Sequence, residues 1–153
     1  MQYPSKSLNK TLHGSYEKVG KALAHGVPSS IATAVMNCPP VRNQILRKVM
    51  KVVSNEVTGL CSKANPSILR KTGKKDLEKF DVEDVCKEWR ERAPVFYSFL
   101  LTTAVNKNTK NFTWFGSLAV AGSVLLKQRN REMNATSAIM GVILKSKAAE
   151  VWF

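Results

Sequence analysis

The chain has 153 residues, 44% of them hydrophobic, and a formal net charge of +13 at pH 7 with a pI near 9.9. This length suits one ordinary domain with a single core, and the apolar content excludes wholesale disorder. The three cysteines, Cys38, Cys61 and Cys86, never form a Cys-x-x-Cys pair, which argues against a disulfide framework and a zinc site. No apolar run follows the first residues, so we expect no secretory signal and an intracellular protein.

The positive charge is concentrated in the front half of the chain. Residues 1–75 hold 13 Lys or Arg against two acidic residues, residues 76–105 have a net charge of −3, and residues 106–153 have a net charge of +5. A basic front half indicates a polyanionic partner. Nucleic acid is the simplest candidate, and an anionic membrane surface is the less simple one.

The first 26 residues are polar and basic, and we expect them to be a loose, partly helical lead-in. Gly14, Gly20 and Gly26 interrupt any helix there at six-residue intervals. A short helix is predicted over residues 28–36. It should end before Pro39, because a proline disfavours helical geometry in the residue that precedes it.

Residues 41–61 predict an amphipathic helix with a basic stripe. Placed at 100° intervals, Arg47, Lys48 and Lys51 cluster on one face. This stripe is interpreted either as a phosphate-contacting face or as a solvated, lysine-rich surface. The opposite face is apolar and consists of Val41, Ile45, Val49, Val52, Val53 and Leu60.

Residues 65–75 form a basic loop, opened by Pro66 and closed by Gly73. Such a loop suits contact with a nucleic-acid backbone, but it contains no aromatic residue to stack on a base, so binding would be weakly sequence-selective. The complete set of candidate nucleic-acid-binding residues is Arg42, Arg47, Lys48, Lys51, Arg70, Lys71, Lys74 and Lys75.

Two further helices are expected over residues 81–105. Asp81 should cap the first, and Pro94 should end it and open the second. Asp81, Asp84 and Glu88 would share one helix face and could hold Mg²⁺, but acidic residues are expected in a first helical turn for the helix dipole alone. Because the chain also lacks the common catalytic motifs, we expect no enzyme activity, no cofactor and no metal.

Residues 112–144 predict a helix, a tight polar turn at 127–132 and a second helix. Thr113 and Asn134 are residue types that cap a helix N-terminus. Both segments are apolar nearly all round, which predicts a buried central pair. The longest apolar run has 13 residues, shorter than the roughly 20 that a bilayer needs, so no membrane span is expected.

No stretch shows the alternation of a strand, so the predicted fold class is all-α. We expect a single irregular domain of about six or seven helices with a buried C-terminal helix pair. Residues 1–40 should be a basic, loosely ordered lead-in, and residues 41–153 a helical domain that is part of a longer architecture. The aromatic tip, Trp152 and Phe153, either folds back, or belongs to a longer chain, or docks on another protein.

Several motifs resemble a multicopy family of uncharacterised animal proteins derived from mobile elements. The resemblance covers roughly residues 40–150 and is most specific in the Leu-Leu-Lys-Gln-Arg-Asn sequence that ends at Asn130. It implies a helical region that often precedes a larger domain of unknown function, in a nuclear or genome-associated setting, and it brings no catalytic residue. The motifs are residues 60–63, 66–70, 88–89, 92–96, 119–130 and 133–135, with Leu77 and Phe80.

Two functions are therefore predicted. The first is a non-catalytic helical module of a mobile-element-derived protein that binds DNA or RNA nonspecifically through its basic front half. The alternative is an interaction or oligomerisation module that meets another protein or a second copy through Trp152 and Phe153. An enzymatic function survives only if catalytic residues lie in a C-terminal extension.

Overall fold

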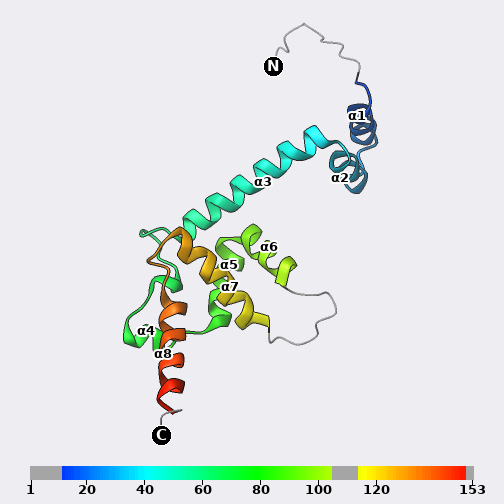
Figure 1. The fold of residues 1–153 in the computed structure, drawn as a ribbon. Helices are drawn as coiled ribbons and strands as arrows, with labels where there is room; N and C mark the ends of the chain where they lie inside the picture. The colour runs from blue at the N-terminus through cyan, green and yellow to red at the C-terminus, as the bar shows by residue number, and fades with distance from the viewer. Residues whose placement is uncertain (1–11, 105–113, 151–153) are drawn as a thin grey trace. The chain divides into compact units, whose positions relative to one another are not determined.

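The computed structural model describes residues 12–104 and 114–150 of the chain (Figure 1). Within these residues the secondary structure is entirely helical, so the predicted all-α class is confirmed. The elements are α1 (Ser15–His25), α2 (Pro28–Met36), α3 (Pro39–Leu60), the 3₁₀ turn η1 (Ile68–Arg70), α4 (Lys74–Glu78), α5 (Val82–Arg92), α6 (Pro94–Ala104), α7 (Trp114–Arg129) and α8 (Ala135–Glu150).

Contacts divide the chain into two compact units, residues 1–50 and residues 51–153. We call them unit 1 and unit 2 and describe each by itself. Helix α3 begins in unit 1 and ends in unit 2.

Unit 1 contains a pair of short helices, α1 and α2, that contact each other. Gly14 precedes α1 and Gly26 follows it, both with positive φ angles of 64° and 71°, which glycine adopts without strain. Gly20, in contrast, lies inside α1, so the expectation that all three glycines interrupt a helix is wrong for this one. A lone glycine lowers helix propensity by about 1 kcal/mol, and the other residues of the segment offset that cost.

The predicted helix over residues 28–36 is confirmed as α2, and Pro39 opens α3. Proline is tolerated in a first helical turn, where its missing N–H group would have no helical acceptor. Cys38, between the two helices, is fully buried and its thiol donates a hydrogen bond to Ser15 Oγ at 3.3 Å.

Unit 2 contains the main hydrophobic core, centred on Trp89 of α5. The Trp89 ring is fully buried and meets Phe96 edge to face, with 5.7 Å between the ring centroids. Helix α7 crosses this ring at Gly122, where no side chain separates the two helices. The buried cluster consists of Val57, Leu60, Leu69, Val85, Cys86, Trp89, Ala93, Phe96, Tyr97, Leu100, Leu118, Ala119, Leu126 and Met133.

Two predicted helix starts are confirmed by their hydrogen bonds. Asp81 accepts a hydrogen bond from the Glu83 N–H group at 2.9 Å and so caps α5. The start of α6 is capped from another helix, because the Glu56 carboxylate on α3 accepts from the Val95 and Phe96 N–H groups at 3.2 and 2.9 Å. The capping role of Glu56 had no local signal in the sequence.

The predicted helix–turn–helix of residues 112–144 is present as α7 and α8, but the expectation that both helices are buried is wrong. Helix α7 buries Leu118 and Leu126, whereas its Val124 side chain is 56% exposed. Helix α8 diverges from α7 beyond the turn (Figure 1) and packs mainly on η1, which leaves Val142 64% exposed. An apolar helix is buried only where a neighbour covers it, and η1 is too short to cover α8.

The two predicted helix caps in this region have different outcomes. Thr113 lies outside the described residues. Asn134 does precede α8, and its backbone carbonyl accepts from Ala138 at 2.9 Å. Its side-chain oxygen, however, is buried and accepts no hydrogen bond, so the predicted side-chain cap is wrong.

Candidate nucleic-acid interface

Three exposed cations on α3, Arg47, Lys48 and Lys51, form the candidate interface with the least opposing charge. We call them the α3 basic face. Their spacing of three and four residues places Lys51 beside the other two along one side of the helix. No acidic residue occurs in the sequence between Glu17 and Glu56, so no carboxylate on α3 neutralises the first four turns of the helix. This face therefore presents positive charge to solvent.

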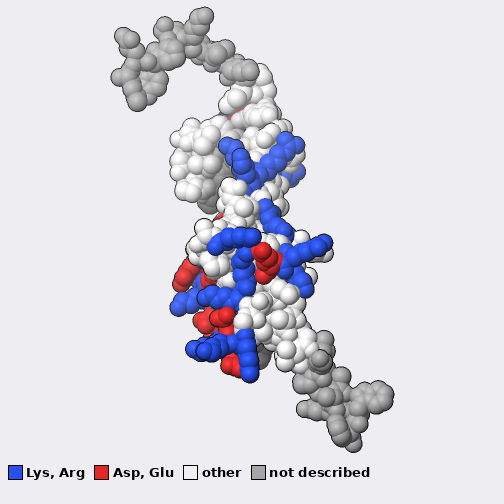
Figure 2. Space-filling view, turned by 90° about the vertical axis from the view of Figure 1, so that its left-hand side faces the viewer, with Lys and Arg blue, Asp and Glu red and all other residues white. Residues whose placement is uncertain are grey.

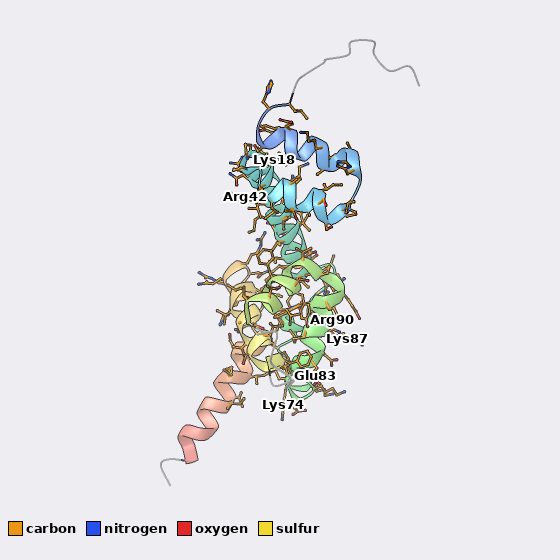
Figure 3. All side chains as sticks on the ribbon, turned by 90° about the vertical axis from the view of Figure 1, so that its right-hand side faces the viewer. Lys18, Arg42, Lys74, Glu83, Lys87 and Arg90 are labelled. Atoms are coloured by element: carbon orange, nitrogen blue, oxygen red, sulfur yellow. The ribbon has the colours of Figure 1, made fainter. Side chains whose placement is uncertain are left out.

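Lys and Arg side chains are frequent on the surface shown in Figure 2, and acidic side chains are interleaved with them mainly over unit 2. In unit 1, Lys18 and Arg42 are labelled in Figure 3. Arg42 is half-buried and forms no ion pair among the described residues. It remains available to an anion, although it is less accessible than the α3 basic face.

The apolar side of α3 agrees only in part with the prediction. Leu60 is fully buried, but Ile45 and Val52 are exposed. Val57 was not among the residues predicted for the apolar face, yet it is buried in the core of unit 2. Burial on α3 is confined to its last turns because that is the part that contacts the core cluster.

Arg70 differs from the other predicted binding residues because its guanidinium is engaged inside the protein. Its side chain is only 13% exposed, forms an ion pair with Glu132 and donates to the Cys61 carbonyl at 2.9 Å. An arginine held in this way cannot turn to a phosphate without breaking both contacts. We therefore leave Arg70 out of the proposed interface.

Arg70 belongs to a group of side chains that hold the C-terminal end of α3. Arg92 donates to the carbonyls of Gly59 and Asn65 at 3.2 and 2.7 Å. The last carbonyls of a helix lack intrahelical donors, and cations near them are favoured by the helix dipole. The other members of the group are Arg129, which donates to Ser54 and Thr58, and Asn130, which donates to the Cys61 carbonyl.

Lys71, Lys74 and Lys75 are all exposed, as a surface interface requires. The two lysines on α4 share that short helix with Asp76 and Glu78. Interleaved carboxylates weaken the local positive potential. This second basic cluster therefore presents a weaker field than the α3 basic face.

Of the three acidic residues considered for Mg²⁺, Glu88 and Asp81 have structural partners. Glu88 accepts from the Ser67 hydroxyl at 2.6 Å and from the Ile68 N–H group at 3.3 Å, and it forms an ion pair with Arg92. Asp81 is the cap described above. Over residues 12–104 and 114–150, no three His, Cys, Asp or Glu side chains come together in a group that could hold a metal ion.

The three cysteines carry free thiols, and two of them, Cys38 and Cys86, are buried. Burial raises the pKa of the Cys61 thiol, an effect that the nearby Arg129 and Arg70 guanidinium groups oppose. Burial likewise raises the pKa of Cys86. A thiol with a raised pKa is a poor nucleophile at neutral pH, so neither residue offers reactive chemistry.

The predicted interaction residues Trp152 and Phe153 lie outside the described residues. Helices α8 and α4 border an apolar groove of about 540 Å³, lined in part by Leu77, Ile139 and Val142. None of the helices described is long and apolar enough to cross a membrane.

The chain matches no protein-family model, and no curated protein or solved structure matches it significantly.

Proposed function

We propose that the chain is a non-catalytic helical module that binds nucleic acid nonspecifically, with the α3 basic face in contact with backbone phosphates. The observation that carries this proposal is the exposure of Arg47, Lys48 and Lys51 on a helix segment without a single carboxylate. Cations of this kind attract a polyphosphate and release its condensed counterions. Arg42, Lys71, Lys74 and Lys75 supply further positive charge.

The strength of this contact depends on salt in a way that can be calculated. Each phosphate contact on duplex DNA contributes about −0.9 to the slope of log affinity against log salt, so three contacts give about −2.7. Between 50 and 200 mM salt, that slope corresponds to a loss of about 40-fold in affinity.

Neutralising the α3 basic face should remove the part of the salt dependence that comes from its three phosphate contacts. In the triple variant Arg47→Gln, Lys48→Gln, Lys51→Gln, we expect weaker binding to a fluorescent DNA duplex at low salt and a salt slope smaller by about 2.7. Fluorescence anisotropy at several salt concentrations measures both quantities.

A matched control removes the same three charges elsewhere. Lys63, Lys79 and Lys87 are exposed and lie outside the α3 basic face. Their triple change to Gln should leave the slope nearly unchanged. Equal losses in the two variants would mean that overall charge, and not this face, governs binding, and unchanged affinity in the α3 variant would refute the proposal.

The setting of this function is also a proposal. The resemblance of residues 119–130 to mobile-element-derived proteins supports a nuclear, genome-associated role, in which DNA and RNA are the abundant polyanions. An intracellular location agrees with the cysteine pattern of the sequence.

A second candidate function is self-association through the groove between α4 and α8. The exposed apolar side chains at this groove, including Val142, favour this candidate because an apolar patch gains free energy when a second copy covers it. Analytical ultracentrifugation should then show a dimer at high protein concentration that dissociates in Val142→Lys. The same change at Gln128, which is exposed outside this groove, serves as the control. A wild-type chain that stays monomeric would exclude this function.

A further inference from the structure

The polar turn between α7 and α8 forms a pocket that the proposed function does not use. The pocket has a volume of about 490 Å³ and is lined by Val124, Lys127, Gln128, Arg131, Asn134 and Ser137. Its lining holds two cations, two side-chain amides, one hydroxyl and no carboxylate. This set of groups suits an anion that accepts hydrogen bonds. The volume falls within the roughly 300–1,000 Å³ of small-ligand sites.

The residues of the turn divide into two groups with different tasks. Arg129, Asn130 and Glu132 attach the turn to the end of α3 and to η1, through the contacts with Thr58, the Cys61 carbonyl and Arg70. The only carboxylate of the turn is thereby paired away from the pocket. The turn is thus fixed by one set of side chains while the other set lines a concave surface.

The two cations of the pocket are available to a ligand. Arg131 is exposed and makes no hydrogen bond or ion pair in the described part of the chain. Lys127 is half-buried, and its ammonium group donates to Ser137 Oγ at 2.9 Å, which leaves two of its three N–H groups for an anion. An ammonium held in place by a hydroxyl loses less side-chain entropy on binding than a free one. A phosphate between Lys127 and Arg131 would meet a fixed cation and a flexible one.

Asn134 adds an independent observation. Its side-chain oxygen is shielded from solvent and accepts no hydrogen bond, and Asn134 is one of the residues that line the pocket. A buried acceptor without a donor is unfavourable, so a bound group that carries a hydroxyl or amine next to its phosphate would remove a defect of the free protein. A nucleotide has both parts, an anionic phosphate and the donor groups of its sugar or base.

We propose that this pocket binds one nucleotide, with its phosphate between Lys127 and Arg131 and a sugar or base donor on Asn134. This inference deepens the proposed function. It rests on that function for one point, namely that the bound nucleotide is part of a DNA or RNA strand. The residues that would recognise this nucleotide differ from those of the α3 basic face.

The test uses the full chain and adenosine 5′-monophosphate as the probe, followed by chemical shifts in ¹H–¹⁵N NMR spectra. We expect saturable shifts in residues 127–137, and binding about tenfold weaker in Arg131→Gln and in Lys127→Gln, as for loss of one charge-assisted hydrogen bond. Lys87→Gln removes an exposed charge on α5 and is the control, for which binding should not change. Absence of shifts, or equal affinity in all variants, would overturn the proposal.

Inorganic phosphate distinguishes the nucleotide from a simple anion. Asn134→Ala should weaken binding of the nucleotide but not of phosphate, whereas Arg131→Gln should weaken both. If Asn134→Ala changes neither, the assignment to a nucleotide is wrong. The two proposals also fail separately. If the nucleotide does not bind but duplex binding remains salt-dependent, only the proposal for the pocket is refuted. If the nucleotide binds but the duplex does not, only the proposal for the α3 basic face is refuted.

Discussion

Replacing Gly122 with alanine is expected to lower the free energy of unfolding of unit 2 by about 1–3 kcal/mol. A Cβ atom at this position would overlap the Trp89 ring and lie 2.8 Å from Leu100 Cδ1. The Trp89 ring is fully buried and rigid, so it cannot turn away as a flexible side chain would. Helix α7 must then move away from α5, and packing around the ring is lost. Urea denaturation followed by circular dichroism measures the change.

The same substitution at Gly116 is a matched control on the same helix. A Cβ atom there meets nothing within 4 Å. Since alanine favours a helix over glycine by about 0.5–1 kcal/mol, Gly116→Ala should stabilise the protein. The two substitutions therefore have opposite expected signs. A stabilised Gly122→Ala variant would contradict the close packing of α7 on Trp89.

A second change tests the cause of the Gly122 effect. Trp89→Phe removes the part of the indole that the new Cβ would overlap, at the cost of packing volume. In the double variant with Gly122→Ala, the combined loss should be smaller than the sum of the two single losses. Additive losses would mean that the destabilisation comes from elsewhere on α7.

Local signals in the sequence predicted several helix boundaries. Pro39 predicts where α2 ends, Asp81 where α5 begins, and Pro94 where α6 begins. Proline and capping residues act on the backbone within one turn of themselves. These features depend on neighbours along the chain, so a single sequence contains enough information to locate them.

Contacts between distant residues could not be predicted in the same way. The capping of α6 by Glu56 joins residues 39 and 40 positions apart, and Arg129 reaches Ser54 across 75 positions. The local sequence does not distinguish these charged side chains, which have partners inside the protein, from charged side chains that are solvated at the surface. For the same reason Arg70 was predicted to bind nucleic acid, although its guanidinium is held by Glu132 and the Cys61 carbonyl. The exposure of α8 also depends on which neighbour covers it, and an apolar composition does not specify that neighbour.

The most damaging single change in the group that holds the end of α3 should be Arg92→Gln. Arg92 pairs with Glu88 and donates to the carbonyls of Gly59 and Asn65, so one guanidinium joins α5 to two segments distant in sequence. The Glu88 side chain is only 9% exposed and would lose its cation. Breaking a fully buried pair costs about 3–5 kcal/mol. Because Arg92 is 23% exposed, we expect a loss of about 2–3 kcal/mol in the free energy of unfolding.

Two further variants separate charge from geometry at this position. Arg92→Lys keeps the positive charge, but one ammonium cannot reproduce a planar fork that reaches a carboxylate and two carbonyls at once. It should therefore recover only part of the loss. Lys87→Gln changes an exposed cation on the same helix and should alter stability by no more than about 0.5 kcal/mol.

The outcome of these three variants identifies the role of Arg92. Full recovery in Arg92→Lys would mean that only the charge beside Glu88 matters and that the bonds to Gly59 and Asn65 contribute nothing. A loss in Arg92→Gln no larger than that in Lys87→Gln would contradict the whole arrangement. Partial recovery would support the view that Arg92, together with Arg70 and Arg129, holds the C-terminal end of α3. In that case the cations available to nucleic acid are those of the α3 basic face, Arg42 and the exposed lysines Lys71, Lys74 and Lys75.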